Sequence, residues 1–367
     1  MRGSSFESMP VETAAERNSR RMVSYPHIVG MLSVLLVVCI ALVIHLDTGK
    51  DRQPALRPSQ ITKHSNTLLQ VSEERSGLSI AWLMSFPNSG TSFTSKLVRH
   101  VTLGSTGSNY GHEVLSTDKV ISMFGDDHPP FWIDPHSLDT WTRPSSLVLT
   151  KTHCGGRCEM CGPSDYVENP HSFLTQCLSG RVGDETASQY DIKLVKKAVH
   201  LIRNPFDNVV SRFHLERKLF SDRGNNKFTS DRTGFLAFCQ RLSDNYGAEE
   251  RDARWLDPHV YDMIKDVPCF SDFVRYVQWH NLAFVATQDK AIPTLVLHYE
   301  KFESNFDETV DGLIEFLESP RRGKNIEFIL GKEYLDYFSE VEKDAIREGI
   351  KRMALSPTWD NVKHYFD

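Results

Sequence analysis

Several features that would classify a chain quickly are absent from this sequence. It has no internal repeat and no low-complexity tract, which excludes a solenoid or a repeat array. It has no Asn-x-Ser/Thr sequon, so N-glycosylation cannot indicate on which side of a membrane the chain lies. Positive charge is not in excess either, because 42 Lys and Arg stand against 48 Asp and Glu, a net charge of −6. We therefore expect no nucleic-acid partner. A strongly anionic polysaccharide would need a local basic groove. Residues 212–232, in which basic side chains outnumber acidic ones, are a candidate for such a groove.

A complete Walker A motif is also missing, although residues 80–101 have the pattern of a phosphate-binding loop. An apolar run, Ile80 to Phe86, ends in Pro87-Asn-Ser-Gly90, and a second apolar pattern at helical spacing follows. When a tight loop connects a strand to a helix, the backbone N–H groups of the loop and the positive end of the helix point to one place, where an anion fits. Because Thr91 stands where Walker A has its Lys, we expect a donor with a shorter phosphate chain than a nucleoside triphosphate. An ordinary strand-to-helix turn is the alternative.

A second candidate site follows the short apolar run 146–150. The run ends in Lys151 and His153, which are two residues apart and point to the same side if the strand continues. Because α/β sheets bind ligands at the carboxyl ends of their strands, a cation and a base here are suited to group transfer. A surface Lys and a hydrogen-bonded His are the alternative.

A third candidate site begins at Arg203, where the predicted strand 198–202 ends. Asn204 has the character of an N-cap, Pro205 of a first helical residue and Asp207 of an acid in the first turn. A guanidinium at this position can grip a phosphate with two parallel hydrogen bonds. A structural salt bridge is the alternative. The buried face of the following helix is predicted to consist of Phe206, Val209, Val210 and Phe213.

The order of these elements predicts an α/β domain with a central parallel sheet flanked by helices. Later segments fit this scheme, with a mostly buried helix at 271–286, a strand at 293–300 and a helix at 305–317. Residues 104–144 are irregular and rich in Gly, Pro, His and aromatic side chains. They either shape a substrate site or form a surface excursion.

The amino-terminal part predicts a single membrane anchor. The run from Ile28 to Leu46 is almost wholly apolar, and at 1.5 Å per residue it reaches about 28 Å, close to one hydrocarbon core. Basic residues precede the run and no net charge follows it, so the positive-inside rule places the amino terminus in the cytoplasm. We expect a cytoplasmic tail at 1–26, a transmembrane anchor at 27–46, a stem at 47–76 and a lumenal domain at 77–367.

The cysteines agree with an oxidising compartment. One of the seven, Cys39, lies in the apolar run, and six lie beyond it: Cys154, Cys158, Cys161, Cys177, Cys239 and Cys269. Six cysteines allow fifteen disulfide pairings. The alternative is a zinc site formed by Cys154, Cys158 and Cys161 with Cys177 or His171.

Three segments, in this order, resemble the sulfotransferase family. Phe86-Pro-Asn-Ser-Gly-Thr-Ser-Phe93 is similar to the family's 5′-phosphosulfate loop, typically Tyr-Pro-Lys-Ser-Gly-Thr-Thr-Trp. Lys151-Thr-His153 is similar to the motif of the cytosolic members, in which the His is the catalytic base and the Lys contacts the sulfuryl group. Arg203-Asn-Pro, with Ser211 eight residues after the Arg, is similar to the 3′-phosphate motif. Tyr299-Glu resembles an element whose Tyr lies near the adenine.

The resemblance implies a P-loop-like nucleotide fold and a sulfotransferase on a Golgi membrane. The donor would be 3′-phosphoadenosine 5′-phosphosulfate (PAPS), with no metal required. The acceptor would be a hydroxyl, on a glycan because of the secretory location. His153 and Lys151 would be catalytic. The implied donor contacts are Asn88, Ser89, Gly90, Thr91, Ser92, Phe93, Arg203, Ser211 and Tyr299.

The sequence departs from the family pattern at two places. Asn88 stands where many members have a Lys that stabilises the leaving oxygen, and we expect Lys151 to supply this charge. No Arg-Lys-Gly motif is found near the carboxyl end, and Arg321-Arg-Gly323 is the nearest string. The alternatives are a small-molecule or lipid O-sulfotransferase, a P-loop kinase, and a catalytically silent lumenal binding protein.

Overall fold

The structure is a computed structural model that describes residues 79–110, 120–122, 147–156, 169–182, 185–222, 228–252, 256–328, 334 and 337–367. The chain divides into two units, Met1–Asn66 and Thr67–Asp367, and every described residue belongs to the second. Among these residues, no helix is long and apolar enough to cross a membrane. The predicted tail, anchor and stem (1–26, 27–46 and 47–76) lie outside the described residues.

The predicted parallel sheet is confirmed. Its six strands are ordered β3-β2-β4-β1-β7-β8, and every neighbouring pair is parallel. They are β1 (Ser79–Ser85), β2 (Thr106–Ser108), β3 (Val120–Ser122), β4 (Leu147–Thr152), β7 (Val195–Ile202) and β8 (Thr294–His298). The register brings the carboxyl ends of the strands together, because Met84 of β1 pairs with Thr152 and Ser85 pairs with Leu201.

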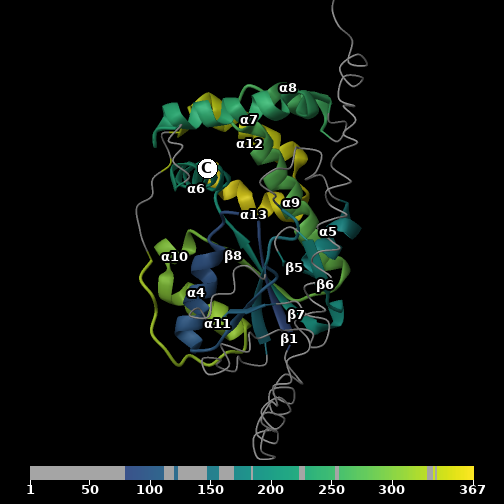
Figure 1. The fold of residues 1–367 in the computed structure, drawn as a ribbon, viewed down its shortest axis with the longest axis vertical. Coiled ribbons are helices and arrows are strands. Elements are labelled where there is room, and N and C mark those ends of the chain that lie inside the picture. Colours follow the sequence, from purple (N-terminus) through teal and green to yellow (C-terminus); the bar gives the residue numbers. More distant parts are fainter. Residues whose placement is uncertain are drawn as a thin grey trace, which may run out of the picture. The chain divides into compact units, whose positions relative to one another are not determined.

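Helices cover both faces of this sheet, as the almost uninterrupted apolar sequences of its central strands require (Figure 1). On one face, Ala81 and Leu83 of β1 pack with α4 (Thr91–Thr102) and α11 (Phe306–Phe316). On the other face, Trp82 and Met84 belong to a larger cluster that includes α6 (Pro205–Asp222) and α9 (Phe270–Asp289). The four predicted buried residues of α6 all lie in this cluster.

The other described elements are shorter or lie outside the sheet. Residues 179–189, for which the sequence predicts no structure, contain an antiparallel pair of strands, β5 and β6. The bounds are α5 (Pro170–Cys177), β5 (Ser179–Val182), β6 (Glu185–Gln189), η5 (Ile192–Leu194), α7 (Arg232–Asp252), α8 (Pro258–Ile264), α10 (Lys301–Ser304), α12 (Glu340–Met353), α13 (Ser356–Val362) and η7 (Lys363–Tyr365).

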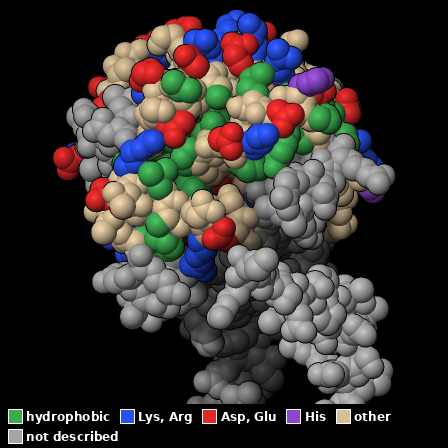
Figure 2. Space-filling view, turned by 90° about the horizontal axis from the view of Figure 1, so that it is seen from above, with side chains coloured by type: hydrophobic (Ala, Val, Ile, Leu, Met, Phe, Trp, Pro, Cys, Tyr) green, Lys and Arg blue, Asp and Glu red, His purple; other side chains and the backbone are tan. Residues whose placement is uncertain are grey.

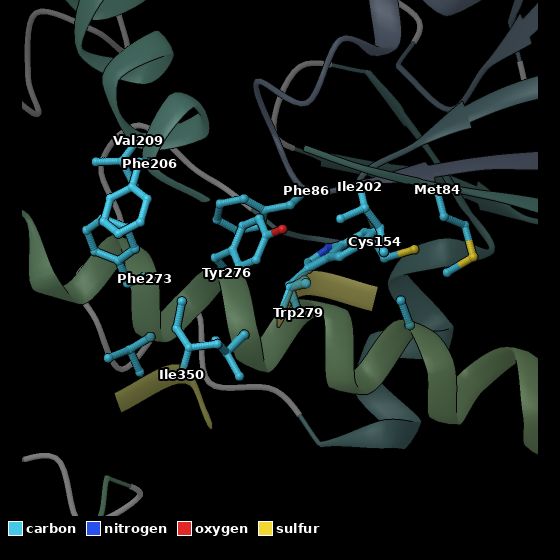
Figure 3. Close-up of a cluster of buried hydrophobic side chains, with 14 of the residues drawn as sticks. Met84, Phe86, Cys154, Ile202, Phe206, Val209, Phe273, Tyr276, Trp279 and Ile350 are labelled. Carbon is cyan, nitrogen blue, oxygen red and sulfur yellow. The ribbon is translucent and has the colours of Figure 1, made fainter. Parts of the chain in front are cut away.

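Helix α9 is the main support beneath the candidate site. Most of its residues are buried, because the sheet lies on one side and α12 and α13 on another. Figure 3 shows Tyr276 and Trp279 of α9 pointing toward Phe86, which follows β1. The Phe86 ring lies 5.8 Å from the ring of Tyr276 and 6.3 Å from that of Trp279.

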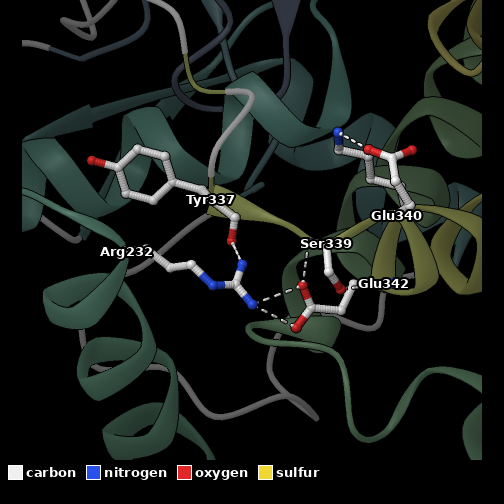
Figure 4. A network of polar contacts seen from close by, with 6 residues as sticks. Arg232, Tyr337, Ser339, Glu340 and Glu342 are labelled. Atoms are coloured by element: carbon white, nitrogen blue, oxygen red, sulfur yellow. Dashed lines mark hydrogen bonds and ion pairs between the residues drawn. The ribbon is translucent and has the colours of Figure 1, made fainter.

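A polar network joins the start of α7 to the start of α12 (Figure 4). The Arg232 guanidinium donates to both carboxylate oxygens of Glu342, each at 3.1 Å, and to the backbone oxygen of Tyr337. Glu342 also completes a capping box with Ser339, the N-cap of α12. The Glu342 carboxylate thus stabilises the start of α12 and holds it to the start of α7.

Two disulfides are present among the described residues, Cys154–Cys177 and Cys239–Cys269. The zinc alternative is wrong for Cys154 and Cys177, because each sulfur is bonded to the other. Cys158 and Cys161 lie outside the described residues. Since Cys154 follows His153 directly, the first disulfide ties the end of β4 to α5.

Candidate functional site

The predicted site segments begin where four neighbouring strands end. Phe86, His153, Arg203 and Tyr299 are the first residues after β1, β4, β7 and β8. Because the strands are parallel and in register, all four segments lie at one edge of the sheet.

The loop between β1 and α4 has the tight geometry that its sequence predicts. Asn88 and Gly90 have positive φ angles of 68° and 97°. A Cβ atom at Gly90 would lie 2.0 Å from the Tyr299 ring, so glycine is required for its conformation and for the space. The backbone oxygen of Gly90 accepts from the N–H of Thr94 at 3.0 Å, which begins the helix.

Two side chains from α6 and its amino-terminal turn hold this loop. The Arg203 guanidinium donates to the backbone oxygen of Asn88 at 2.9 Å and lies over the Tyr299 ring, 5.0 Å from its centroid. Asn208 donates to the backbone oxygen of Pro87 at 2.9 Å and to the hydroxyl of Ser89 at 3.0 Å. Asn208 was not predicted, because a buried Asn inside a helix gives no signal of which distant loop it contacts.

The loop, Arg203 and Tyr299 line one cavity of about 620 Å³. Seven of the predicted donor-binding residues line it: Asn88, Gly90, Ser92, Phe93, Arg203, Ser211 and Tyr299. The side chains of Ser89 and Thr91 are buried and are not part of its lining. The volume is within the usual range for small-molecule and cofactor sites.

An aromatic cluster forms one wall of the cavity. Phe93, a predicted donor contact, and Tyr299, predicted to lie near an adenine, are joined by Phe328, whose ring lies 5.0 Å from Phe93 and 5.3 Å from Tyr299. Phe328 was not predicted, because its segment has no regular secondary structure and no motif. A flat aromatic ligand group is suited to this wall.

Carboxylates and a second cation also line the cavity. Lys96, Asp207, Glu300, Glu303 and Glu327 were not predicted as lining residues. Both oxygens of Glu300 are engaged, one by the N–H of Asn204 at 2.8 Å and the other by the Tyr365 hydroxyl at 2.7 Å. Burial raises the pKa of Asp207 to about 6, and the nearby Arg203 guanidinium opposes the shift.

His153 follows β4 at the same edge of the sheet and is held from several directions. Its backbone N–H donates to the Tyr110 hydroxyl at 2.9 Å, and its backbone oxygen accepts from the indole N–H of Trp279 at 2.7 Å. Its Nδ1 lies 2.8 Å from the backbone oxygen of Ser85 and 3.2 Å from the Ser85 hydroxyl. The ring is therefore fixed against the first residues of the loop.

Lys151 and His153 each lie near the ring of Tyr110. β4 ends at Thr152, so the condition that the strand continues through His153 is not met. The Lys151 ammonium lies 5.5 Å from the centroid of the Tyr110 ring, and the His153 ring lies 5.6 Å from it. Neither residue is among those that line the cavity.

Arg321-Arg-Gly323 does not contribute to the cavity. Arg321 pairs with Asp311, and the N–H groups of Arg322 and Gly323 donate to the backbone oxygen of Val101 at the far end of α4. The string therefore supports the end of a helix. Among the described residues, no group of three or more His, Cys, Asp or Glu side chains could hold a metal ion.

Comparison with protein families identifies a match for the carboxyl-terminal part of the chain. Residues 189–354 match the family model of the sulfotransferase domain. The match covers less than half of the chain and contains Arg203, Ser211 and Tyr299, whereas the loop at 88–93 and the pair Lys151 and His153 lie before it. It supports sulfuryl transfer as the general activity. Comparison with curated proteins gives no match.

Proposed function

We propose that this chain is a PAPS-dependent sulfotransferase that acts on an acceptor hydroxyl. The observation that carries the proposal is the convergence of the glycine loop, Arg203 and Tyr299 on one cavity at the carboxyl edge of a parallel sheet. The family match supports the reaction class.

In this proposal the donor occupies the cavity from its aromatic wall to the loop. The adenine lies against Phe93 and Tyr299, and Arg203 with Ser211 binds the 3′-phosphate. The N–H groups at the start of α4 bind the 5′-phosphate, because the helix end carries partial positive charge.

The chemical step is a direct transfer at sulfur. The acceptor oxygen forms a bond to sulfur while the bond from sulfur to the phosphate oxygen breaks. His153 takes the hydroxyl proton on Nε2, and 3′-phosphoadenosine 5′-phosphate (PAP) leaves. Positioning and charge stabilisation carry most of the rate, as in phosphoryl transfer.

Lys151 supplies the positive charge that Asn88 lacks. An amide can donate a hydrogen bond but brings no charge. We expect Lys151→Ala to lower turnover by roughly 10²–10³-fold, the usual effect of removing one transition-state donor. Near-complete retention of turnover would contradict this role.

A glycan hydroxyl is the proposed acceptor, with the chain anchored in the Golgi membrane through residues 27–46. Two of the basic residues in 212–232 are engaged internally, because Arg212 pairs with Asp272 and Arg232 with Glu342. On the face shown in Figure 2, basic and acidic side chains are interspersed. These observations favour an acceptor of modest charge. Protease protection of the full chain in microsomes tests the lumenal placement.

Calorimetric binding of PAP to the full-length chain tests the donor site. We expect micromolar binding that Arg203→Ala abolishes. Arg321→Ala is the matched control, because this Arg pairs with Asp311 outside the cavity. Equal binding of ATP and PAP, or binding that Arg203→Ala does not weaken, would overturn the proposal in favour of a P-loop kinase or an unrelated site.

A catalytically silent binding protein is the second candidate, and Asn88 is the observation that favours it. Binding of PAP together with release of sulfate or transfer to any acceptor would exclude it. Binding without turnover across an acceptor screen would support it.

A further inference from the structure

Arg203 is a buried cation that forms no ion pair within the part of the chain that the structure describes. The residue is only 9% exposed, and its Nε is buried without a hydrogen-bond partner. One of its other guanidinium nitrogens donates to the backbone oxygen of Asn88. Buried charges in proteins are normally paired with an opposite charge. The guanidinium is therefore available to an anion that enters the cavity.

Carboxylates that could pair with this cation lie in the same cavity. Asp207 and Glu300 line it together with Arg203. Burial raises the pKa of Asp207, the Arg203 charge opposes the rise and the Glu300 charge adds to it, so both charges lie near this carboxyl group. Glu300 also follows Tyr299 directly, and the centroid of the Tyr299 ring lies 5.0 Å from the Arg203 guanidinium. A pair between Arg203 and Glu300 would compete with a bound phosphate.

Two hydrogen bonds engage both oxygens of the Glu300 carboxylate. One oxygen accepts from the backbone N–H of Asn204 at 2.8 Å, and the other accepts from the hydroxyl of Tyr365 at 2.7 Å. Hydrogen bonds to an ionised group are stronger than neutral ones, so the two donors restrain the side chain. If the Tyr365 hydroxyl is removed, one oxygen is released while the carboxylate stays beside the turn that carries Arg203.

The Tyr365 hydroxyl is held from its other side as well. Tyr365 belongs to η7 near the carboxyl end of the chain, and its oxygen lies 2.9 Å from Nδ1 of His298 in β8. Because the single hydroxyl proton is donated to Glu300, Nδ1 of His298 is the donor in this contact. The hydroxyl is thus fixed between the sheet and Glu300.

We propose that Tyr365 is a positioning residue that prevents Glu300 from pairing with Arg203 and so leaves the guanidinium free for a phosphate of the donor. Tyr365 is not among the residues that line the cavity, so it acts through Glu300. This inference rests on the proposed function, in which Arg203 binds the 3′-phosphate of PAPS.

Calorimetric binding of PAP to the full-length chain tests the inference. The variants are Tyr365→Phe, Glu300→Gln and the double variant. Tyr190→Phe is the matched control, because it also removes a buried hydroxyl, which donates to the backbone oxygen of Cys177 outside the cavity. Urea unfolding shows that each variant is folded under the conditions of the binding measurement.

We expect the Kd for PAP to rise about tenfold in Tyr365→Phe, the effect of losing one hydrogen bond to a charged group. Glu300→Gln keeps an oxygen for the N–H of Asn204 and should bind PAP more tightly than the wild type, because a negative charge leaves the cavity. The double variant should match Glu300→Gln within about twofold, since no carboxylate remains to compete. In Tyr190→Phe the Kd should change less than about threefold.

The double variant separates this role from a packing role. If Tyr365 only supported the fold of the carboxyl end, the double variant would bind PAP as weakly as Tyr365→Phe, and that result would overturn the proposal. An unchanged Kd in Tyr365→Phe, or weaker binding in Glu300→Gln, would overturn it as well.

The position of Glu300 can also be observed directly. In a crystal structure of Tyr365→Phe without ligand, we expect a Glu300 oxygen within about 4 Å of a guanidinium nitrogen of Arg203. A carboxylate that stays on Asn204 alone would refute the inference. Failure of the proposed function would instead appear as wild-type binding of PAP that is absent or insensitive to Arg203→Ala, and the crystal structure would still test the position of Glu300.

Discussion

Gly90→Ala is expected to be the most informative single change in the loop, because two independent costs meet at this residue. Gly90 has φ 97° and ψ 13°, a left-handed conformation that costs an L-residue roughly 1–2 kcal/mol. The added Cβ would lie 2.0 Å from the Tyr299 ring, below any contact distance. That ring is held by Phe93, Phe302 and Phe328, so it cannot move without disturbing the aromatic wall.

Overpacking of a well-packed region typically costs about 1–3 kcal/mol. Together with the backbone cost, we expect Gly90→Ala to lower the free energy of unfolding by about 2–5 kcal/mol. It should also weaken PAP binding at least tenfold, because the displaced ring lies in the cavity. Urea unfolding of the full-length chain, followed by tryptophan fluorescence, gives the stability, and calorimetry gives the affinity.

Gly312→Ala is the matched control, because nothing lies within 4 Å of a Cβ added at this position in α11. There the same substitution should stabilise the chain by about 0.5–1 kcal/mol, since Ala is the better helix former. The clash disappears when Tyr299 is also replaced by Ala. Compared with Tyr299→Ala, the double variant Gly90→Ala/Tyr299→Ala should therefore show only the backbone cost. A loss below 0.5 kcal/mol in Gly90→Ala, or equal effects at the two glycines, would refute the reasoning.

Three further predictions follow from buried polar groups. PAP affinity should rise as pH falls through about 6, where Asp207 becomes protonated, and Asp207→Asn should remove that part of the dependence seen by calorimetry. Burial lowers the pKa of His200 to about 3 and lowers that of His280, so below pH 6.5 the unfolded chain takes up protons that the folded chain does not. Stability should therefore fall by about 1.4 kcal/mol per pH unit for each such His. Urea unfolding at pH 7.0 and 5.5 measures this, and equal values would contradict it. Tyr365→Phe should cost about 1–3 kcal/mol in urea unfolding, because Glu300 loses the hydroxyl donor at 2.7 Å. An unchanged midpoint would show that water replaces it.

The sequence predicts the order of the elements well, because each site segment follows an apolar strand. It predicts the Arg203 turn closely. Asn204 accepts from the N–H of Phe206 at 2.9 Å, and Pro205 begins α6. Local rules decide these features, since an N-cap and a proline at the first helical position act within one turn.

The site contacts that the sequence does not predict depend on packing between segments that are distant in the chain. Tyr110 reaches His153 because β2 pairs with β4, with Gly107 opposite Thr150 and Ser108 opposite Lys151. This pairing joins residues more than forty positions apart, and no local pattern in either segment specifies the partner. The same holds for Phe328 and Asn208, whose partners are set by how the helices fold over the sheet edge.

Helix α9 sets the spacing between Arg203 and His153. The Tyr276 hydroxyl donates to the backbone oxygen of Arg203 at 2.7 Å, and the Trp279 indole donates to that of His153 at 2.7 Å. The two donors are three residues apart on α9 and therefore share a face of the helix. The two acceptors follow β7 and β4, which lie on either side of β1. Because a buried helix deforms little, Arg203 and His153 cannot move apart without breaking one of these two hydrogen bonds.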